Sequence, residues 1–405
     1  MTRPLEGIRV LELAVYGLVP TAGAVLAEWG ADVVKVEHPE TGDPIRGLVA
    51  FGVKPGDGGV TYLWEIFNRG KRSIGVDVAH PEGRELVLSL AGEADVFLTN
   101  FLAPARRRLG VDAADVMARN PRIIYGRGTA HGNKGDDADR GGFDGISYWA
   151  RTGMSIAAIP ADYTHPIHLP GPAFGDIQTG MHLAGGIAAA LFHRERTGRG
   201  CVVDTSLLAS GLWAMQATMV GAQVTDRERL PAFDRRHPGN PLTNVYRSRD
   251  GRFVVLAFLE ADRYWPGFCE AVGRPDLIDD PRFGTAQARL ENVEECVGML
   301  DDLFAERPFA EWQKILDSQD GQWATVQTPR EALADQQAVV NGYVQTVAYE
   351  TGAQLALVPA PVQFDEEVPQ LSPGPAHAAH TDEVLGGLGL STERLLELKL
   401  AGAIS

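Results

Sequence analysis

The sequence predicts an α/β fold, in which an open, mostly parallel, Rossmann-like sheet has helices on both faces and is followed by a smaller α+β domain. Short runs rich in β-branched residues alternate with helical segments along the first third of the chain. Such alternation is typical of a parallel sheet. The length of 405 residues suffices for two domains. Hydrophobic residues form 44% of the chain, enough for a sizeable core in one or two units.

Short apolar segments define the expected elements of the sheet. Strands are expected at residues 8–13, 32–37, 73–78, 95–99 and 122–126, with a possible sixth at 200–205. Helices are expected at residues 20–29, 80–91 and 104–117. Pro20 and Pro81 lie near first turns and Gly30 follows the end of the first helix, as helix-terminus preferences favour. Ligands of such sheets bind beyond the carboxyl ends of the strands, so the site is expected in the loops after residues 13, 37, 99 and 126.

The rest of the chain is predicted to complete the large domain and to form a small one. Two further helices, at 183–196 and 207–220, complete a large domain that spans residues 1–220. The small domain is expected at residues 221–345, with a polar linker at about 221–241. It contains a hairpin at 245–257 that turns at Asp250-Gly251, and helices around 260–272, 286–305 and 308–319.

The last part of the chain is expected to return to the large domain. Thr328 and Glu331 have the spacing of a capping box at a helix start. Residues 346–405 form the return, with a Pro-rich extended segment at 359–375 and a helical pair at 381–402. Extended Pro-rich segments span distance without a core of their own.

Composition and motifs exclude several classes of protein. The formal net charge of −16 argues against a nucleic-acid-binding surface. Three widely spaced cysteines without a C-x-x-C pair indicate neither a zinc site nor a disulfide framework. The chain has no apolar signal core and no apolar run long enough for a membrane span, so a soluble cytoplasmic protein is expected. Neither G-x-G-x-x-G nor G-x-x-x-x-G-K-[ST] is present, which argues against dinucleotide and nucleoside triphosphate cradles.

The stretch Pro170–His182 holds the most suggestive single residue, Asp176. It is expected in a short loop between Gly175 and Gly180, just before the helix at 183–196. Glycines let a backbone come close to a ligand, and the helix dipole holds a nearby carboxylate ionised. Asp is also a common helix N-cap. Spacing alone leaves both interpretations, a reactive carboxylate and a cap, open.

Segments spread along nearly the whole chain resemble the class III CoA-transferases, the CaiB/BaiF family. That family includes formyl-CoA transferase and the carnitine and bile-acid CoA-transferases, with α-methylacyl-CoA racemase as a close relative. The resemblance is weakest between about 220 and 345. It is carried by Pro4–Glu12, Gly30–Glu37, Asn68–Ser73, Asp95–Phe101, Gly175–Gly180 and His380–Leu385.

The resemblance implies a reaction and a set of site residues. Asp176 matches the aspartate that forms acyl-anhydride and aspartyl-CoA intermediates. CoA is then a co-substrate, no cofactor is bound permanently, no metal is needed, and the partners are an acyl-CoA, a carboxylic acid and a second copy in an interlocked homodimer. The implied CoA-binding residues are Tyr16, Gly17 and Leu18 at the thioester end, His38 near the adenine, Lys71 and Arg108 at the phosphates, Asn100 and Phe101 in a contacting turn, and Arg140.

Two other functions stay open on the same fold. The racemase has a His before an Asp in the segment that matches Gly141–Asp144, where this chain has Phe143. Phe143 cannot move a proton, which favours transfer. A non-catalytic acyl-CoA-binding protein is the third interpretation.

The acyl group is not fixed by the resemblance. The region Arg235–Asn244 lacks the tetraglycine of formyl-CoA transferase, which argues against formate and oxalate. Its Arg235, Arg236 and His237 are either ligands of a substrate carboxylate or ordinary linker charges, with equal weight.

Overall fold

A computed structural model describes residues 2–160 and 163–405 and divides the chain into two compact units. The first unit combines three stretches, Met1–Ala157, Pro166–Leu230 and Gln336–Ser405. The second unit consists of Ala158–His165 and Pro231–Asp335. The two stretches of the small unit therefore interrupt the large one in sequence at two places. Among the described residues, no helix combines the length and the apolar composition that a bilayer crossing requires.

The first unit is built on a six-stranded sheet in the order β3-β2-β1-β4-β5-β6, in which all neighbours run parallel. This confirms the predicted α/β class, including the sixth strand. The order reverses between β1 and β4, where such folds open a crevice for a ligand. The strands are β1 (Arg9–Leu13), β2 (Asp32–Glu37), β3 (Arg72–Gly75), β4 (Val96–Thr99), β5 (Ile124–Thr129) and β6 (Val202–Ser206).

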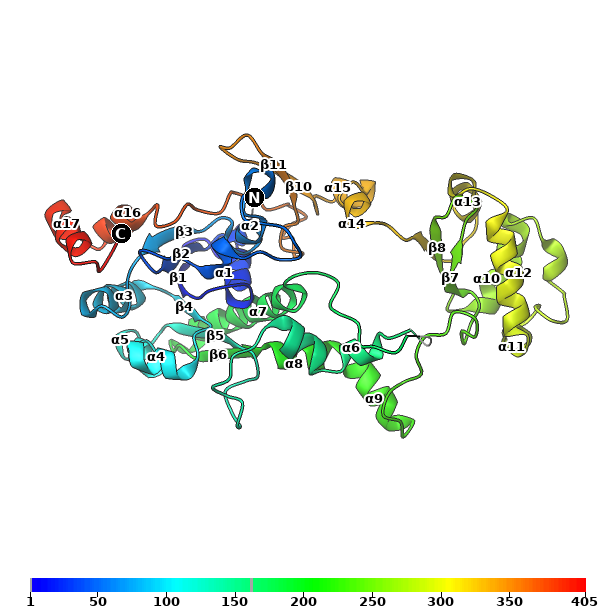
Figure 1. The fold of residues 1–405 in the computed structure, drawn as a ribbon, viewed down its shortest axis with the longest axis horizontal. Coiled ribbons are helices and arrows are strands. Elements are labelled where there is room, and N and C mark those ends of the chain that lie inside the picture. The colour runs from blue at the N-terminus through cyan, green and yellow to red at the C-terminus, as the bar shows by residue number, and fades with distance from the viewer. Residues whose placement is uncertain (1, 161–162) are drawn as a thin grey trace. The chain divides into compact units, whose positions relative to one another are not determined.

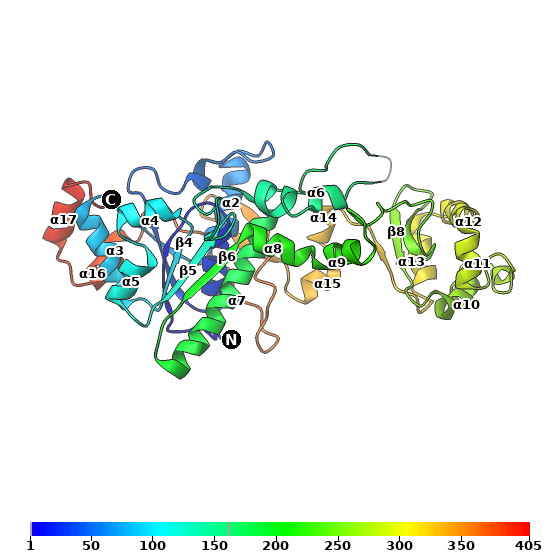
Figure 2. The ribbon, with the colours of Figure 1, turned by 90° about the horizontal axis from the view of Figure 1, so that it is seen from below.

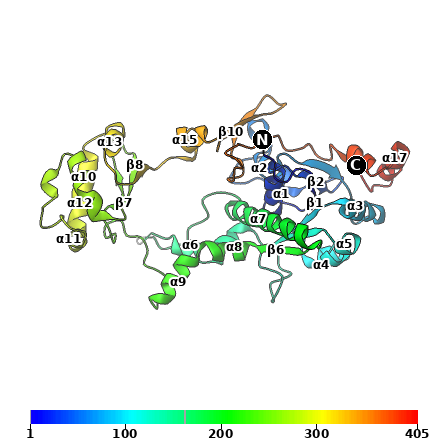
Figure 3. The ribbon, with the colours of Figure 1, turned by 180° about the vertical axis from the view of Figure 1, so that it is seen from behind.

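Alternating side chains of the strands fill two separate cores, one on each face of the sheet. On one face, Val10, Val33 and Leu98 pack against α1 (Leu18–Glu28) and α7 (Phe174–Thr197); Figure 3 shows both helices on this side. On the other face, apolar residues of the same strands pack beneath a second layer of helices (Figure 1). That layer consists of α3 (Pro81–Glu93), α5 (Ala113–Arg119), α16 (Thr381–Gly387) and α17 (Thr392–Leu400).

The predicted helix at 104–117 is wrong, because the chain forms two helices there. The first, α4 (Ala103–Leu109), ends at Gly110, whose φ of +66° is left-handed. Asp112 then starts α5 with a capping box that it shares with Asp115. A left-handed glycine followed by an Asp cap is a common helix stop and start. The predicted helix at 207–220 is likewise divided, into α8 (Leu207–Ala214) and α9 (Gln216–Val224).

The C-terminal stretch belongs to the first unit and contains the predicted helical pair near its end. Before that pair it forms an unexpected hairpin, β10 (Gln345–Ala348) and β11 (Gln354–Leu357). Its last residues reach the edge of the sheet, where Ile404 bridges Val76 and both Ala403 and Ile404 are buried. The remaining short helices are η1 (Pro44–Gly47), η2 (Asp57–Gly59), α2 (Tyr62–Asn68), η3 (Gly145–Ala150), α6 (Met154–Ala157) and α15 (Gln336–Val340). They include α2, α6 and α15, which Figure 2 labels.

The second unit packs helices against a three-stranded antiparallel sheet, β7-β8-β9. The predicted hairpin is confirmed, with Gly251 at its turn in a left-handed conformation (φ +85°). The capping box of Thr328 and Glu331 is also confirmed, although the helix it starts, α14 (Pro329–Ala332), is short. The other elements are β7 (Thr243–Arg247), β8 (Phe253–Ala257), β9 (Trp323–Thr325), α10 (Ala261–Ala271), η4 (Pro275–Leu277), α11 (Ala286–Glu291), α12 (Val293–Ala305) and α13 (Phe309–Leu316).

Candidate active site

A cavity of about 590 Å³ opens in the first unit at the carboxyl ends of β1, β4, β5 and β6. The switch in strand order between β1 and β4 places it where a ligand is expected. Its wall is mostly aliphatic and aromatic, with few polar groups. The lining residues are Val15, Tyr16, Gly17, Leu18, Asn100, Phe101, Leu102, Ala105, Arg108, Leu109, Gly128, Thr129, Ala130, Gly141, Gly142, Phe143, Ile146, Asp176 and Leu207.

Asp176 lies in this wall, but in a helix rather than in the predicted loop. Helix α7 begins at Phe174, nine residues before the predicted start at 183. Its N-cap is Ala173 in a left-handed conformation (φ +60°), so Asp176 is at the third helical position and does not cap the helix. Within the described part of the chain, the Asp176 carboxylate has no hydrogen bond or ion pair, which leaves it available to a ligand.

Close helix packing, rather than ligand contact, accounts for the two glycines beside Asp176. A Cβ at Gly180 would lie 2.6 Å from the carbonyl oxygen of Leu18. A Cβ at Gly175 would lie 2.6 Å from the Tyr148 side chain. Both distances are below van der Waals contact, so these glycines let α7 approach its neighbours. The glycine that the carboxylate itself needs is Gly17, where a Cβ would lie 2.6 Å from Asp176 Oδ2.

The protonation of Asp176 also differs from the expectation. Burial, and in second place the neighbouring Asp144 carboxylate, raise the pKa of Asp176 to about 7. Burial likewise raises the pKa of Asp144. Asp144 is oriented by the Gly175 N–H, which donates to its Oδ2 over 3.1 Å. Desolvation and a like charge therefore outweigh the stabilising effect of the α7 N-terminus on the Asp176 carboxylate.

The structure brings six of the nine predicted CoA-binding residues to the cavity together with Asp176. Tyr16, Gly17 and Leu18 come from the turn between β1 and α1. The other three are Asn100 and Phe101, directly after β4, and Arg108 on α4. They converge because the carboxyl ends of parallel strands meet at one edge of a sheet.

The other three predicted residues lie elsewhere. His38 is exposed after β2, where its Nδ1 accepts hydrogen bonds from the N–H groups of Glu40 and Thr41. Arg140 is exposed and its guanidinium lies 3.6 Å from Asp137. Neither side chain lines the cavity.

Lys71 does not line the cavity either, and its ammonium is buried in the first unit. It donates to Glu12 Oε2 over 2.7 Å, to the Pro20 carbonyl over 2.8 Å and to Asn68 Oδ1 over 3.0 Å. Its side chain has no exposed surface. Burial lowers the pKa of Lys71 to about 8. The residue serves the interior of the first unit.

Comparison with known proteins assigns the chain to a family. The model of CoA-transferase family III matches residues 5–381. This chain is a family III CoA-transferase.

Relatives of this family III CoA-transferase match it over almost their full lengths. (R)-2-Hydroxy-4-methylpentanoate CoA-transferase of Clostridioides difficile is 30% identical over 396 residues, which cover 98% of each chain. Cinnamoyl-CoA:phenyllactate CoA-transferase of Clostridium sporogenes is 31% identical over 404 residues, which cover 98% of this chain and 96% of that protein. The crystal structure of a CAIB/BAIF family protein from Brucella suis has a TM-score of 0.80 at 26% identity and covers 96% of this chain and 100% of its own.

Two residues of this CoA-transferase's cavity region were not predicted as site residues. Asp144 faces Asp176 closely enough to shift its pKa. Phe143 lies in the wall and meets the Tyr16 ring edge to face, with centroids 5.5 Å apart. Both belong to the segment Gly141–Asp144, which the sequence comparison singled out only for its missing His. Their role depends on how η3 and α7 pack, which has no periodic sequence signal.

The charges at 235–237 belong to the second unit of the CoA-transferase and are largely engaged there. Arg235 pairs with Asp301. His237 lies between Asp234 and Glu294, 2.8 Å from a carboxylate oxygen of each. Arg236 is exposed beside them. These contacts favour the interpretation of Arg235 and His237 as structural charges.

Proposed function

We propose that this family III CoA-transferase moves CoA from an acyl-CoA thioester to a carboxylic acid through covalent intermediates on Asp176. The observation that carries the proposal is the unpaired Asp176 carboxylate in the wall of the apolar cavity. A carboxylate is a weak nucleophile, but a thioester is an activated acyl donor. Covalent catalysis then divides the exchange into steps of similar difficulty.

The first half of the proposed reaction transfers CoA to the protein. An Asp176 oxygen attacks the thioester carbonyl, the C–S bond breaks, and CoA leaves as the thiolate, which gives a mixed anhydride. The thiolate then attacks the β-carbonyl of Asp176, and the donor acid leaves as its carboxylate. The product is an aspartyl-CoA thioester.

The second half runs the same steps in reverse with the acceptor acid. The acceptor carboxylate attacks the aspartyl-CoA carbonyl and releases the CoA thiolate, which forms a second anhydride. Attack of the thiolate on the acyl carbonyl of that anhydride yields the new acyl-CoA and frees Asp176. No proton is gained or lost over the cycle.

The start of α1 supports the stabilisation of the oxyanions formed in these steps. Gly17 and Leu18 lie at the N-terminus of α1, in the cavity wall, and Gly17 packs against the Asp176 carboxylate. A helix leaves its first N–H groups without partners inside the helix. These groups and the helix dipole favour negative charge beside them.

Apolar acyl groups are the substrates that the cavity favours. Phe101, Leu102, Phe143, Ile146 and Leu207 line the same cavity as Asp176. Two relatives are named for (R)-2-hydroxy-4-methylpentanoate and for cinnamoyl-CoA and phenyllactate. We propose aliphatic or aryl monocarboxylic acids for this chain as well. Racemisation is disfavoured by Phe143, since a ring without a titrating group faces the cavity.

A transfer assay tests the proposed function directly. Labelled CoA esters of aryl, branched aliphatic and dicarboxylic acids are incubated in turn with a panel of free acids, and new thioesters are identified by mass spectrometry. We expect transfer to be fastest among the apolar monocarboxylic acids. Exchange of the α-hydrogen of the acyl group with solvent, without any transfer, would contradict the proposal and support a racemase.

Activity is expected to fall on the acid side of neutrality. The Asp176 nucleophile must be ionised, and its pKa is raised to about 7. Below that pH, kcat/KM should fall by about tenfold per pH unit, because protonation removes the nucleophile. Asp144→Asn removes a like charge and should move the acid limb to lower pH. A kcat/KM profile that is flat from pH 5 to pH 8 would contradict this prediction.

Arg108 is expected to bind the phosphates of CoA. Arg108→Ala should weaken the binding of CoA by about tenfold, as the loss of one charge-assisted contact implies, and should leave a pantetheine thioester unaffected. The neighbouring Arg107→Ala is the matched control, because Arg107 lies 3.9 Å from Asp139 and does not line the cavity. Calorimetry measures both ligands. An equal loss for CoA and for the pantetheine thioester would contradict the assignment.

We further propose an interlocked homodimer and a cytoplasmic location. The family resemblance implies the dimer, and α8 and α9 expose the large apolar side chains that an interface would cover, including Trp213 and Val224 at 70% and 81% exposure. Cys201, Cys269 and Cys296 are free thiols, which suits a reducing compartment.

A further inference from the structure

The turn between β1 and α1 is held in an unfavourable conformation beside the nucleophile. Tyr16 has a φ of +64°, a left-handed value that costs energy for a residue with a side chain. Gly17 follows it so close to Asp176 that an added Cβ would lie 2.6 Å from the Oδ2 of that carboxylate. Such conformations persist only where the surrounding structure fixes them.

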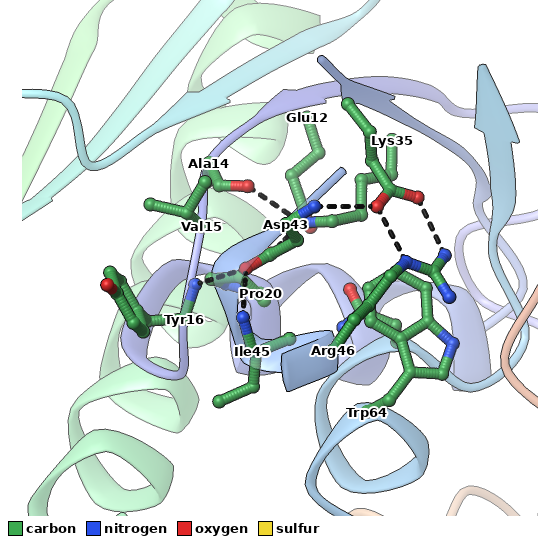
Figure 4. Close-up of polar contacts among 12 residues, drawn as sticks. Glu12, Ala14, Val15, Tyr16, Pro20, Lys35, Asp43, Ile45, Arg46 and Trp64 are labelled. Carbon is green, nitrogen blue, oxygen red and sulfur yellow. Dashed lines mark hydrogen bonds and ion pairs between the residues drawn. The ribbon is translucent and has the colours of Figure 1, made fainter. Parts of the chain in front are cut away.

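Side chains from other elements bind the backbone of this turn residue by residue. Lys35 donates to the Ala14 carbonyl over 2.7 Å. Asn100 binds both backbone groups of Val15, accepting from its N–H over 3.0 Å and donating to its carbonyl over 2.6 Å. Asp43 Oδ1 accepts from the Tyr16 N–H over 3.1 Å, as Figure 4 shows.

Two of these side chains belong to a buried cluster of charges. Lys35 Nζ lies 2.9 Å from Asp43 Oδ2 and 3.0 Å from Glu12 Oε1. Lys71 shares the other oxygen of Glu12 and also donates to the Pro20 carbonyl, just inside α1. The side chains of all four residues are fully buried or nearly so. Burial by itself lowers the pKa of Lys35. The carboxylates of Glu12 and Asp43 outweigh this effect and keep the pKa of Lys35 above its usual value.

Stability gives no reason for this cluster. Desolvation of buried charges is costly, and replacement of a buried ion pair by apolar residues is often neutral or stabilising. What apolar residues could not supply are the donors and the acceptor that reach Ala14, Tyr16 and Pro20. The cluster therefore serves the turn.

Contacts with Glu37 and Arg46 hold Asp43 itself in place. Its backbone N–H donates to Glu37 Oε2 over 2.9 Å. Arg46 makes two hydrogen bonds of 2.8 Å to Glu37, and its guanidinium lies 3.3 Å from the centre of the Trp64 ring. Figure 4 shows Asp43 between this group and the Tyr16 backbone. The carboxylate is thus fixed at the end of a connected chain of contacts.

We propose that Asp43 is a positioning residue for acyl transfer, which fixes the Tyr16–Gly17 turn against Asp176 from within the buried cluster with Lys35 and Glu12. It touches no substrate and acts through the Tyr16 backbone. The inference rests on the proposed function, because the turn matters for rate only if Asp176 is the nucleophile. In this proposal Lys35 and Lys71 hold the two ends of the same turn, through the carbonyls of Ala14 and Pro20.

The test compares three variants of the full chain. In Asp43→Ala the Tyr16 N–H loses its acceptor, and kcat should fall by about 10- to 100-fold with KM changed by less than about threefold, as for an interaction that acts on the reaction step. Asp43→Asn keeps an amide oxygen for that N–H and should retain a kcat within about fivefold of the original, although Lys35 loses one of its two charge partners and stability falls. Asp95→Ala is the control: Asp95 accepts from the Arg9 N–H over 2.8 Å and pairs with Arg194, at the other end of β1. It should lose stability and keep kcat.

A second measurement does not depend on activity. Hydrogen exchange of the Tyr16 amide, read by NMR, should be slow in the original protein and in Asp43→Asn, and fast in Asp43→Ala. Three results would overturn the proposal: a Tyr16 amide that exchanges freely in the original protein, a folded Asp43→Ala with unchanged kcat, or an equal loss of kcat in Asp95→Ala. If Asp43→Ala does not fold, two measurements still test the proposal: hydrogen exchange of the Tyr16 amide in the original protein, and the kcat of Asp43→Asn. If the original protein transfers no CoA at all, the proposed function fails, and the exchange data still judge the contact between Asp43 and the turn.

Discussion

Asp176→Ala is expected to abolish CoA transfer, with a loss in kcat of at least about a thousandfold, on the order seen when the nucleophile of a covalent mechanism is removed. The binding of CoA should be retained, because Arg108, Asn100 and Phe101 contribute to the cavity independently of Asp176. Hydroxylamine added during turnover should convert Asp176 to a hydroxamate only when an acyl-CoA is present, and peptide mass spectrometry would locate it.

Stability provides the control for this prediction. The pKa of Asp176 is about 7 in the folded protein and 3.8 ordinarily, so the folded protein loses stability as the pH rises from about 4 to about 7. Asp176→Asn removes that penalty and should raise the free energy of unfolding by about 2 kcal/mol at pH 8 and not at pH 4, after a discount for partial exposure. Asp176→Asn should also be inactive, because an amide is no nucleophile, and a variant that is inactive yet more stable excludes unfolding as the cause. Near-normal transfer by Asp176→Ala would end the covalent proposal.

Gly17→Ala is expected to lower kcat on the order of a hundredfold, because misplacement of a reacting group by about 1 Å has effects of this size. The added methyl group would lie 2.6 Å from Asp176 Oδ2, so the carboxylate has to rotate or shift. The backbone of Gly17 is right-handed (φ −106°), so alanine fits it without strain. Pre-steady-state formation of the acyl-enzyme measures the defect directly.

Gly185→Ala is the matched control on the helix that carries Asp176. A methyl group at Gly185 meets no atom within 4 Å, so it should leave kcat unchanged. It should also stabilise the protein by about 0.5–1 kcal/mol, the usual gain for alanine in a helix interior. Unchanged acyl-enzyme formation in Gly17→Ala would show that the position of the Asp176 carboxylate is not set by this contact.

The sheet was predictable because most of its strands are buried on both faces and consist of short runs rich in β-branched residues. The start of α7 was not, because it depends on Ala173 in a left-handed conformation and on the packing of Gly175 and Gly180 against neighbouring elements. Local sequence favours a glycine loop there, and tertiary contacts override it. Gly110 shows the opposite case, since a glycine followed by Asp112 was a readable helix stop that the apolar periodicity of the segment obscured.

Among the predicted site residues, too, some could be predicted from topology and others depend on tertiary contacts. Tyr16, Asn100 and Arg108 follow strand ends or lie on the next helix, so topology alone brings them together. Lys71 precedes β3, and its direction depends on the buried partner Glu12 on β1, which is two strands away in the sheet and far away in sequence. A lysine in a polar segment looks like a surface cation until its partner is known. The raised pKa of Asp176 was equally hidden, because it arises from burial and from Asp144.

The way in which the chain closes on itself has a consequence for its synthesis. Residues 231–335 of the second unit are continuous, so that unit can condense soon after it leaves the ribosome. The first unit cannot, since Ala403 and Ile404 bury themselves against Val76 at the edge of a sheet whose first strand begins at Arg9. The β3 edge of the sheet therefore stays uncovered during synthesis until Ala403 and Ile404 have left the ribosome. We therefore expect chains stalled before residue 403 to be prone to aggregation, because an unpaired strand edge can pair with other chains.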